Sequence, residues 1–150
     1  LASIVPVAAV YGLGIKVDWT ADELARMRVL ADRAARHFAD EAGARTQHMR
    51  QAGLRCNLDS PLLDRGVRAD GEGWRTSFDP AAFAVEAPHL ASAIVGLGCP
   101  VHLACGFEDA MVTADRLRDF DPGAVAIVNA GHNAMVDAPV AVWRWINGSR

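Results

Sequence analysis

The sequence has few cysteines, and none of them stands in a paired spacing. Its 150 residues contain three cysteines, and no C-x-x-C motif occurs. An odd number without such pairs argues against a disulfide framework and against a zinc knuckle. We therefore expect Cys56, Cys99 and Cys105 to be reduced, buried thiols and the protein to be cytoplasmic.

A strong excess of charge and a long apolar run are also lacking. The formal net charge is −3, whereas nucleic-acid binding usually demands a strongly basic face, so we expect no nucleic-acid partner. The longest apolar stretch, Leu1–Tyr11, is far shorter than the ~20 residues that a membrane helix needs, so no membrane partner is expected. No charged segment precedes this stretch, which argues against a signal peptide.

Motifs that bind metal ions or phosphate groups are absent as well. The five histidines form no H-x-x-x-H or H-E-x-x-H pattern. His37 and His48 are separated by Gly43, which is predicted to break the helix between them, and His102 falls inside an apolar strand. The short Gly12-Leu13-Gly14 stretch matches neither G-x-x-x-x-G-K-S/T nor G-x-G-x-x-G. We therefore expect neither a metal ion nor a cofactor.

Short apolar strands alternate with helices toward the two ends of the chain. Residues 3–11 (SIVPVAAVY), 100–104 (PVHLA) and 124–128 (AVAIV) have the composition of strands that are buried on both faces. A helix capped by Thr113 is expected between the last two strands, and an amphipathic helix over 137–146 closes the chain. This order is typical of parallel α/β units.

The long segment between the first two strands is predicted to be mostly helical. Thr20 and Glu23 form a T-x-x-E capping box at its start. Apolar residues then repeat at helical spacing and predict one long helix: Leu24, Met27, Ala31, Ala34 and Phe38. Further signals predict a helix over 44–52 ended by Gly53, short helical turns after Ser60-Pro61, Asp79-Pro80 and Pro88, and two extended pieces within 67–78 around Asp70-Gly71.

Two polar residues follow the ends of neighbouring strands. Asp109 comes after the strand over 100–104, and His132 comes after the strand over 124–128. In open parallel sheets, ligands bind beyond the carboxyl ends of the strands, so both side chains are expected in one crevice. There the carboxylate can fix the tautomer of the imidazole, and the imidazole can act as a general base.

The last third of the chain resembles the C-terminal signature of the α/β-hydrolase superfamily. Three stretches carry the resemblance: C-P-V-H-L-A-C-G-F-E-D-A-M-V, N-A-G-H-N and D-A-P-V-A-V-W-R-W-I. In the first, Asp109 takes the place of the acid of the catalytic triad. In the second, His132 takes the place of the base, and the third matches the helix that follows it. The order Asp then His also agrees with the family's order.

The resemblance implies an α/β fold: a mostly parallel sheet, of which this chain holds only the C-terminal strands, with an inserted helical cap. Residues 1–18 would hold a core strand and the lead into the cap. Residues 19–90 would form the cap, or lid, over the active site. Residues 91–150 would form the C-terminal part of the core. Trp19 and Trp74 could line a substrate pocket or simply pack within the cap.

The family's nucleophile is missing from the sequence. It normally lies in a G-x-S-x-G elbow, a strained turn between a strand and a helix. None of the five serines stands in that pattern: Ser3, Ser60, Ser77, Ser92 and Ser149. Three core strands are also few, because sheets average ~5–6 strands. We therefore expect an N-terminal half as a partner, either a second chain or additional sequence that this chain lacks.

The resemblance predicts a hydrolase that acts on a small carboxylic ester, thioester or lactone by a Ser-His-Asp mechanism, with Asp109 and His132 supplied by this chain. One alternative keeps the fold and changes the reaction to that of an epoxide hydrolase, a dehalogenase or a C–C bond hydrolase. Another is a non-catalytic binding module that has lost its nucleophile. Locally, Glu108 is an alternative acid, Asp109 could cap the next helix, and His132 could be an ordinary loop residue.

An arginine-rich stretch lies within the expected cap. It contains Arg26, Arg28, Arg33, Arg36, Arg45, Arg50 and Arg55. Acidic residues interleave with these arginines and reduce the net charge. We interpret the stretch as the solvated face of the cap helices.

Overall fold

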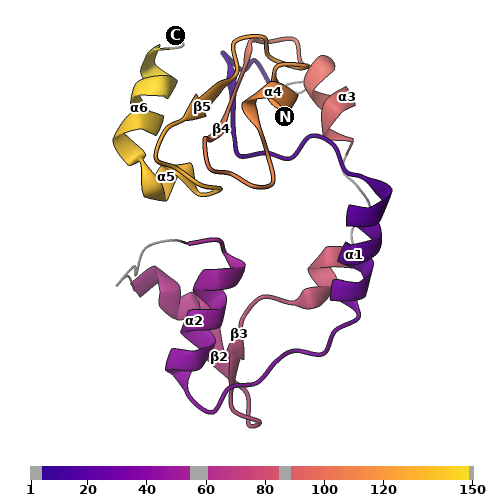
Figure 1. Ribbon diagram of the computed structural model, residues 1–150, viewed down its shortest axis with the longest axis vertical. Coiled ribbons are helices and arrows are strands. Elements are labelled where there is room, and N and C mark those ends of the chain that lie inside the picture. Colours follow the sequence, from indigo (N-terminus) through magenta and orange to yellow (C-terminus); the bar gives the residue numbers. More distant parts are fainter. Residues whose placement is uncertain (1–4, 55–60, 85–88, 149–150) are drawn as a thin grey trace. The chain divides into compact units, whose positions relative to one another are not determined.

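A computed structural model describes residues 5–54, 61–84 and 89–148. The chain divides into two compact units (Figure 1). The sheet unit consists of Leu1–Asp18 together with Pro88–Arg150, and the inserted unit consists of Trp19–Ala87. The inserted unit therefore interrupts the sheet unit in sequence, directly after the first strand of the sheet.

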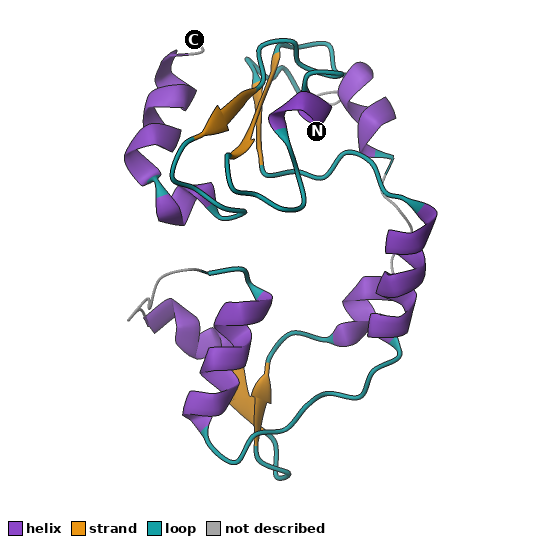
Figure 2. Ribbon diagram, in the orientation of Figure 1, coloured by secondary structure: helices purple, strands orange, loops and turns teal. Residues whose placement is uncertain are grey.

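The sheet unit is built on three parallel strands in the order β1-β4-β5 (Figure 2). These are β1 (Val10–Leu13), β4 (Val101–Gly106) and β5 (Val125–Ile127). β4 lies in the centre, and its register pairs Val10 with Val101 on one side and Ala104 with Val125 on the other. All three strands run in the same direction, so their carboxyl ends lie at one edge of the sheet.

The first strand is shorter than the sequence predicts. It begins at Val10, whereas the apolar pattern predicts a strand from residue 3. Residues 5–9 are outside the ladder, and Pro6 among them has no backbone N–H to donate to a neighbouring strand. Residues 3 and 4 lie outside the described residues.

Both faces of the central strand are covered. Leu103 and Cys105 belong to one buried cluster, which includes Ala114 and Leu117 from the segment of α4 (Ala114–Leu117). Ala104 points to the opposite face, as alternation along a strand requires, and belongs to a second cluster. That cluster includes residues of α5 (Ala134–Asp137) and α6 (Pro139–Gly148), and α3 (Leu90–Val95) packs on the first cluster through Ile94. A strand covered on both faces explains its nearly continuous apolar sequence.

The helices of the sheet unit differ in length from the prediction. The Thr113 side chain caps α4 as expected, by accepting a hydrogen bond from the Arg116 N–H, but α4 ends at Leu117 rather than near Phe120. The closing helix is two helices, α5 and α6. The break falls before Pro139, which cannot donate the intrahelical hydrogen bond of a continuous helix but suits a first helical position.

The inserted unit begins with two helices of eleven residues, α1 (Ala21–Ala31) and α2 (Glu41–Gln51). The capping box of Thr20 and Glu23 is present, with both reciprocal hydrogen bonds formed. The predicted long helix stops at Ala31, so the prediction of a stripe through Phe38 is wrong beyond that point. Phe38 instead forms an isolated antiparallel bridge with Trp74, because its backbone N–H and C=O both bond to that residue.

A small hairpin and two 3₁₀ segments complete the inserted unit. β2 (Val67–Ala69) pairs antiparallel with β3 (Trp74–Thr76), which confirms the two extended pieces predicted around the Asp70-Gly71 turn. The 3₁₀ segments are η1 (Pro61–Gly66) and η2 (Pro80–Ala84), and each begins at a proline, as the sequence predicts. Ser60 and Pro88 lie outside the described residues.

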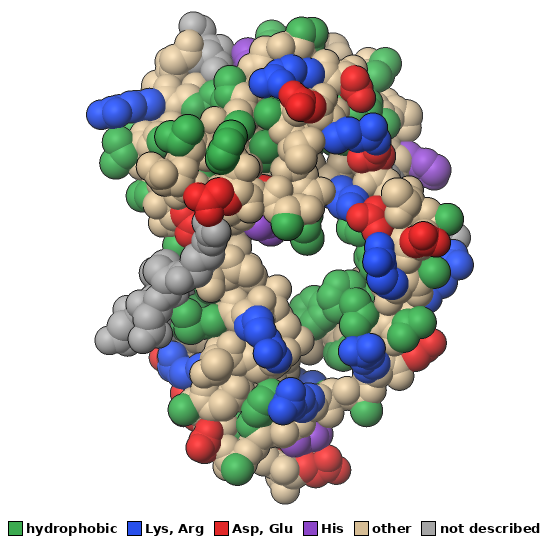
Figure 3. Space-filling view, viewed as in Figure 1, with side chains coloured by type: hydrophobic (Ala, Val, Ile, Leu, Met, Phe, Trp, Pro, Cys, Tyr) green, Lys and Arg blue, Asp and Glu red, His purple; other side chains and the backbone are tan. Residues whose placement is uncertain are grey.

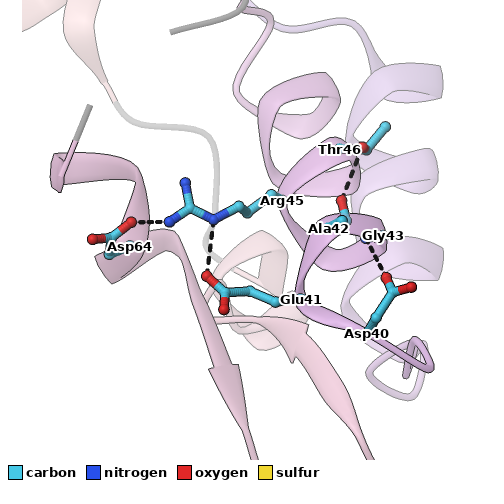
Figure 4. A network of polar contacts seen from close by, with 7 residues as sticks. All are labelled: Asp40, Glu41, Ala42, Gly43, Arg45, Thr46 and Asp64. Carbon is cyan, nitrogen blue, oxygen red and sulfur yellow. Dashed lines mark hydrogen bonds and ion pairs between the residues drawn. The ribbon is translucent and has the colours of Figure 1, made fainter. Parts of the chain in front are cut away.

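Polar side chains tie α2 to its surroundings (Figure 4). The Asp40 carboxylate accepts a hydrogen bond from the Gly43 N–H at 2.8 Å and caps the helix. Arg45 contacts Glu41 one turn earlier, at 2.9 Å, and also pairs with Asp64 of η1. Among the described residues, no helix is long and apolar enough to cross a membrane.

Candidate active site

The candidate site lies at the carboxyl ends of β4 and β5. Asp109 follows β4 after a turn, and His132 follows β5 after a short loop. Gly106, the last residue of β4, permits the two loops to touch. A Cβ atom at this position would lie 2.0 Å from the Gly131 carbonyl oxygen and 2.4 Å from that of Ala130, so no other residue fits without moving the backbone.

Backbone hydrogen bonds lock the two loops together. The Phe107 N–H donates to the Ile127 carbonyl at 2.8 Å, and the Glu108 N–H donates to the Ala130 carbonyl at 2.9 Å. The loop that carries His132 is held from its other side by Asp137, whose carboxylate accepts the Gly131 N–H at 2.8 Å. The loops that carry Asp109 and His132 are therefore held in place by hydrogen bonds of their backbone.

The structure brings Asp109 and His132 into contact. The Asp109 Oδ2 atom lies 2.9 Å from the His132 Nδ1 atom. The other oxygen, Oδ1, accepts backbone N–H groups from Met111 at 2.8 Å and from Val112 at 3.3 Å. The Asp109 side chain is fully buried, whereas the His132 side chain is 38% exposed. The carboxylate is thus satisfied on both oxygens and hidden, while the imidazole reaches the surface of the unit.

The contact with Asp109 favours one tautomer of the imidazole. An ionised carboxylate only accepts hydrogen bonds, so opposite such a carboxylate the Nδ1 atom carries the proton. In the neutral ring the Nε2 atom then has a free lone pair. No described residue forms a hydrogen bond with Nε2. The geometry therefore leaves the Nε2 atom of an oriented imidazole without a partner among the described residues, and an imidazole in this position can act as a general base.

Gly14 forms a further wall of the site. It follows β1 with a backbone φ of +64°, which favours glycine, and its N–H donates to the Ala104 carbonyl at 2.8 Å. A Cβ atom here would lie 3.1 Å from the His132 carbonyl oxygen and 3.8 Å from the Asp109 Oδ2 atom. From the sequence, Gly14 was weighed only as part of a phosphate loop, so its place beside Asp109 and His132 was not predicted.

Asp137 is a second residue of the site that the sequence did not predict. It was predicted as the first residue of the closing helix, but it lies in α5 and holds the backbone next to His132. The available signal was the spacing between Gly131 and Asp137, which places one turn of helix between a loop N–H and a carboxylate. Because acidic residues are common near helices, that signal is weak without coordinates.

Neighbouring candidates play other parts. Glu108 is exposed, and it is the Asp109 carboxylate that contacts His132. His102 stacks on Tyr11, with ring centroids 5.0 Å apart, as a packed histidine would. The Cys105 thiol is buried beneath the site, where burial and then the negative charge of Asp109 raise its pKa. Cys105 is therefore a protonated, unreactive thiol at neutral pH.

Among the described residues, neither the other free cysteine nor a cluster of metal ligands joins the site. Cys99 is a free, partly buried thiol, and Cys56 lies outside the described residues. No group of three or more histidine, cysteine, aspartate or glutamate side chains gathers closely enough to hold a metal ion in the described part of the chain. No described serine forms a hydrogen bond with His132.

Comparisons with known proteins place the fold. No protein-family model matches the sequence, and no curated protein matches it significantly. Solved structures do match: E-2-(acetamidomethylene)succinate hydrolase has a TM-score of 0.70 at 18% identity, covering 98% of this chain and 59% of that one. A thioesterase domain from the curacin biosynthetic pathway has a TM-score of 0.66 at 16% identity, covering 94% and 58%. An esterase from Thermogutta terrifontis has a TM-score of 0.56 at 18% identity, covering 94% and 54%.

The matched structures are α/β-hydrolases, and this chain has the α/β-hydrolase fold. It spans little more than half the length of each structure named above. The parallel sheet with helices on both faces agrees with that fold. The resemblance inferred from the last third of the sequence is thereby confirmed at the level of fold.

Proposed function

We propose that this chain supplies the acid and the base of a serine hydrolase that acts on a carboxylic ester, a thioester or a lactone. The observation that carries the proposal is the 2.9 Å contact between the buried Asp109 carboxylate and the half-exposed His132 ring, at the carboxyl edge of a parallel sheet. The matched structures include a hydrolase, a thioesterase and an esterase, which supports this class of reaction.

The chemistry follows from the tautomer. The His132 Nε2 atom removes the proton from a serine hydroxyl as the serine oxygen attacks the carbonyl carbon of the substrate. The same nitrogen, now carrying the proton, returns it to the departing alcohol or thiol. Asp109 holds the Nδ1–H and stabilises the positive charge that His132 acquires in the transition state. The reaction needs no cofactor.

The serine would come from an N-terminal half that this chain does not contain. β1 pairs with β4 along one edge, and no described strand pairs with its other edge. An unpaired edge leaves a row of backbone donors and acceptors open to a further strand. We propose that the N-terminal half, as a second chain or as additional sequence, adds its strands there and brings the nucleophile toward His132.

The inserted unit would act as the cap. Residues 19–90 would cover the completed active site, exclude water from it and shape the pocket for the apolar part of the substrate. A drier site strengthens every charge interaction that stabilises the transition state.

The experiment begins with the intact mass and identity of every polypeptide that co-purifies with the chain. A second polypeptide with a serine in a glycine-flanked elbow, labelled by a fluorophosphonate probe, is the expected result. The mixture should then hydrolyse p-nitrophenyl esters, and His132→Ala should abolish that hydrolysis. A 150-residue chain that is monomeric, cooperatively folded and active by itself would contradict the proposed partner. A partner with glycine or alanine in place of the serine would instead make the chain a binding module.

A further inference from the structure

A cavity of about 830 Å³ lies within the inserted unit, and the active-site residues do not contribute to it. Its walls come from the end of α1, the segment that follows it, the second half of α2, β3 and η2. Ligand pockets commonly measure ~300–1,000 Å³, so this cavity is large enough for a small molecule. All of its described lining residues belong to Trp19–Ala87.

Much of the cavity wall is apolar. Leu30 reaches it from α1, and Phe83 reaches it from η2. Phe38 and Phe78 add aromatic surface, and Phe78 contacts Phe83 edge to face with ring centroids 5.1 Å apart. An aromatic and aliphatic lining of this kind suits the hydrocarbon body of a ligand, because burial removes that surface from water.

The polar part of the wall has charge of one sign. Three arginines line the cavity, Arg33, Arg36 and Arg50, and no described lining residue is acidic. None of the three forms an ion pair with a described carboxylate. Figure 3 shows basic side chains, in blue, on the surface of the inserted unit.

Two of these guanidinium groups are held at the wall by other lining residues. The Arg36 Cζ atom lies 4.9 Å from the centre of the Phe38 ring, which stacks the cation against the aromatic face. The Arg50 Nη2 atom contacts the Gln47 Oε1 atom. A guanidinium that is already oriented loses less entropy on binding an anion than a free one does.

Thr76 adds an uncharged polar group. It lines the cavity from β3, and the residue as a whole is buried, with 9% of its surface exposed. Its hydroxyl can donate a hydrogen bond to a ligand oxygen.

From these observations we propose that the inserted unit binds an amphipathic carboxylate. The hydrocarbon body occupies the space between Leu30 and Phe83, and the carboxylate meets Arg36 and Arg50, with Thr76 as an additional donor. Because the charged residues of the wall are arginines, the polar group of the ligand should be negatively charged. The apolar lining requires a hydrocarbon chain longer than that of acetate. All of its described lining residues belong to the inserted unit, and neither Asp109 nor His132 is among them. Binding there does not depend on the hydrolysis proposed above.

The test is an isothermal titration of the 150-residue chain with decanoate, kept below its micelle concentration, beside decanol and acetate. We expect decanoate to bind more tightly than either analogue, because decanol lacks the charge and acetate lacks the body. The double variant Arg36→Gln/Arg50→Gln should bind decanoate at least about tenfold more weakly, since each lost charged hydrogen bond is worth a factor of this size. Thr76→Val should weaken binding to a smaller extent.

Arg26→Gln provides the matched control, because Arg26 is an exposed arginine of α1 that does not line the cavity. It should bind decanoate as the unchanged chain does. Equal affinities for decanoate and decanol would overturn the proposal, and so would equal losses in the double variant and in the control. If the double variant loses its circular-dichroism spectrum, Arg50→Gln alone and the comparison of the three ligands decide the question. Because the readout is binding, failure of the hydrolase proposal leaves this test unaffected.

Discussion

The two units of this chain are stabilised in different ways. In the sheet unit, Leu103, Cys105 and Leu117 are fully buried, and two apolar clusters cover both faces of β4. In the inserted unit, the buried apolar residues among those described are Ala44, Leu63 and Val67. α1 has no buried residue, although its eleven residues include a complete capping box. Local hydrogen bonds and surface charges thus carry more of the structure in the inserted unit.

The difference in burial matters for the position of the candidate site. Apolar burial stabilises a domain strongly, whereas exposed ion pairs and helix caps each contribute about 1 kcal/mol or less. The oriented Asp109–His132 pair lies in the unit with the dense core. The unit with sparse burial carries a cavity, and regions with few buried contacts open more easily. We therefore expect the sheet unit to be the more rigid of the two and the inserted unit to open more easily.

The largest expected effect concerns the sheet unit, which carries Asp109 and His132. In the complete hydrolase, Asp109→Asn should keep the fold but lower turnover by up to about 10⁴-fold, the size seen for the equivalent change in a serine protease. The amide would favour the wrong tautomer of His132. The measurement is the kcat for p-nitrophenyl ester hydrolysis. Asp119→Asn, an exposed carboxylate of the same unit, is the control, and a loss of less than tenfold in Asp109→Asn would speak against the assignment.

Removing the same side chain from each unit should give unequal losses of stability. Leu103→Ala empties a fully buried site of β4 and should cost about 2–5 kcal/mol in the free energy of unfolding. Leu30 lines the cavity and is only half-buried, so Leu30→Ala should lower the free energy of unfolding by on the order of 1 kcal/mol. Urea denaturation followed by circular dichroism measures both values. Equal costs would mean that the inserted unit is packed as densely as the sheet unit.

Within the inserted unit, the helix cap of Asp40 should contribute more stability than the exposed hydrogen bond of Thr46. Asp40→Ala removes the acceptor of the Gly43 N–H at the start of α2 and should cost about 1 kcal/mol in unfolding free energy. Thr46→Ala, on the same helix, removes only a bond from a side chain to the Ala42 carbonyl and should be nearly neutral. Proteolysis of this unit under native conditions provides an independent readout. Equal effects of the two substitutions would show that the cap does not stabilise α2.

The surface network around Arg45 should contribute little. A double-mutant cycle that combines Arg45→Ala with Asp64→Ala should give a coupling energy of about 1 kcal/mol or less, because both side chains are partly exposed to solvent. The coupling should also fall as the salt concentration rises. A coupling well above that value would break the comparison, because charges would then stabilise the inserted unit as strongly as burial stabilises the sheet unit.

Acid should weaken the hairpin of the inserted unit in a defined direction. The hydrogen bond from His37 lowers the pKa of Asp70 below its ordinary value. A lowered pKa in the folded state adds stability that is present above the ordinary value of about 4 and is lost as the pH falls through the folded pKa. Asp70→Asn should remove this part of the acid dependence. An unchanged slope of stability against pH in that range would contradict it.

The sequence predicted the parts of the fold that depend on local chemistry. The capping box of Thr20 and Glu23, the proline starts of η1 and η2, and the two extended pieces around Asp70-Gly71 follow from side-chain and backbone rules that act within a few residues. The ends of α1 and β1 were wrong, because a helix or strand continues only where packing or a partner strand rewards it. No pattern in the residues around Phe38 predicts its backbone bridge to Trp74.

The candidate site was predictable in part. Asp109 and His132 were found because each follows an apolar strand, and the parallel order of β4 and β5 brings such ends together. Gly14 and Asp137 escaped notice, because their roles depend on distances between segments that are far apart in the chain or separated by a turn. The cavity of the inserted unit was likewise hidden. The arginine stretch was interpreted as a solvated face, yet three of its members line that cavity.

The pairing of Val10 with Val101 has a consequence for how the chain folds. Joining residues that far apart costs roughly 4 kcal/mol of loop-closure entropy if the intervening segment is an open coil. β4 also leaves the ribosome long after β1, so the edge of β1 that pairs with β4 stays unpaired until then. If residues 19–87 collapse first, the loop that remains to be closed is effectively short. A folded inserted unit would then speed the pairing of β1 with β4. It would also shorten the time during which β1 can pair with other nascent chains.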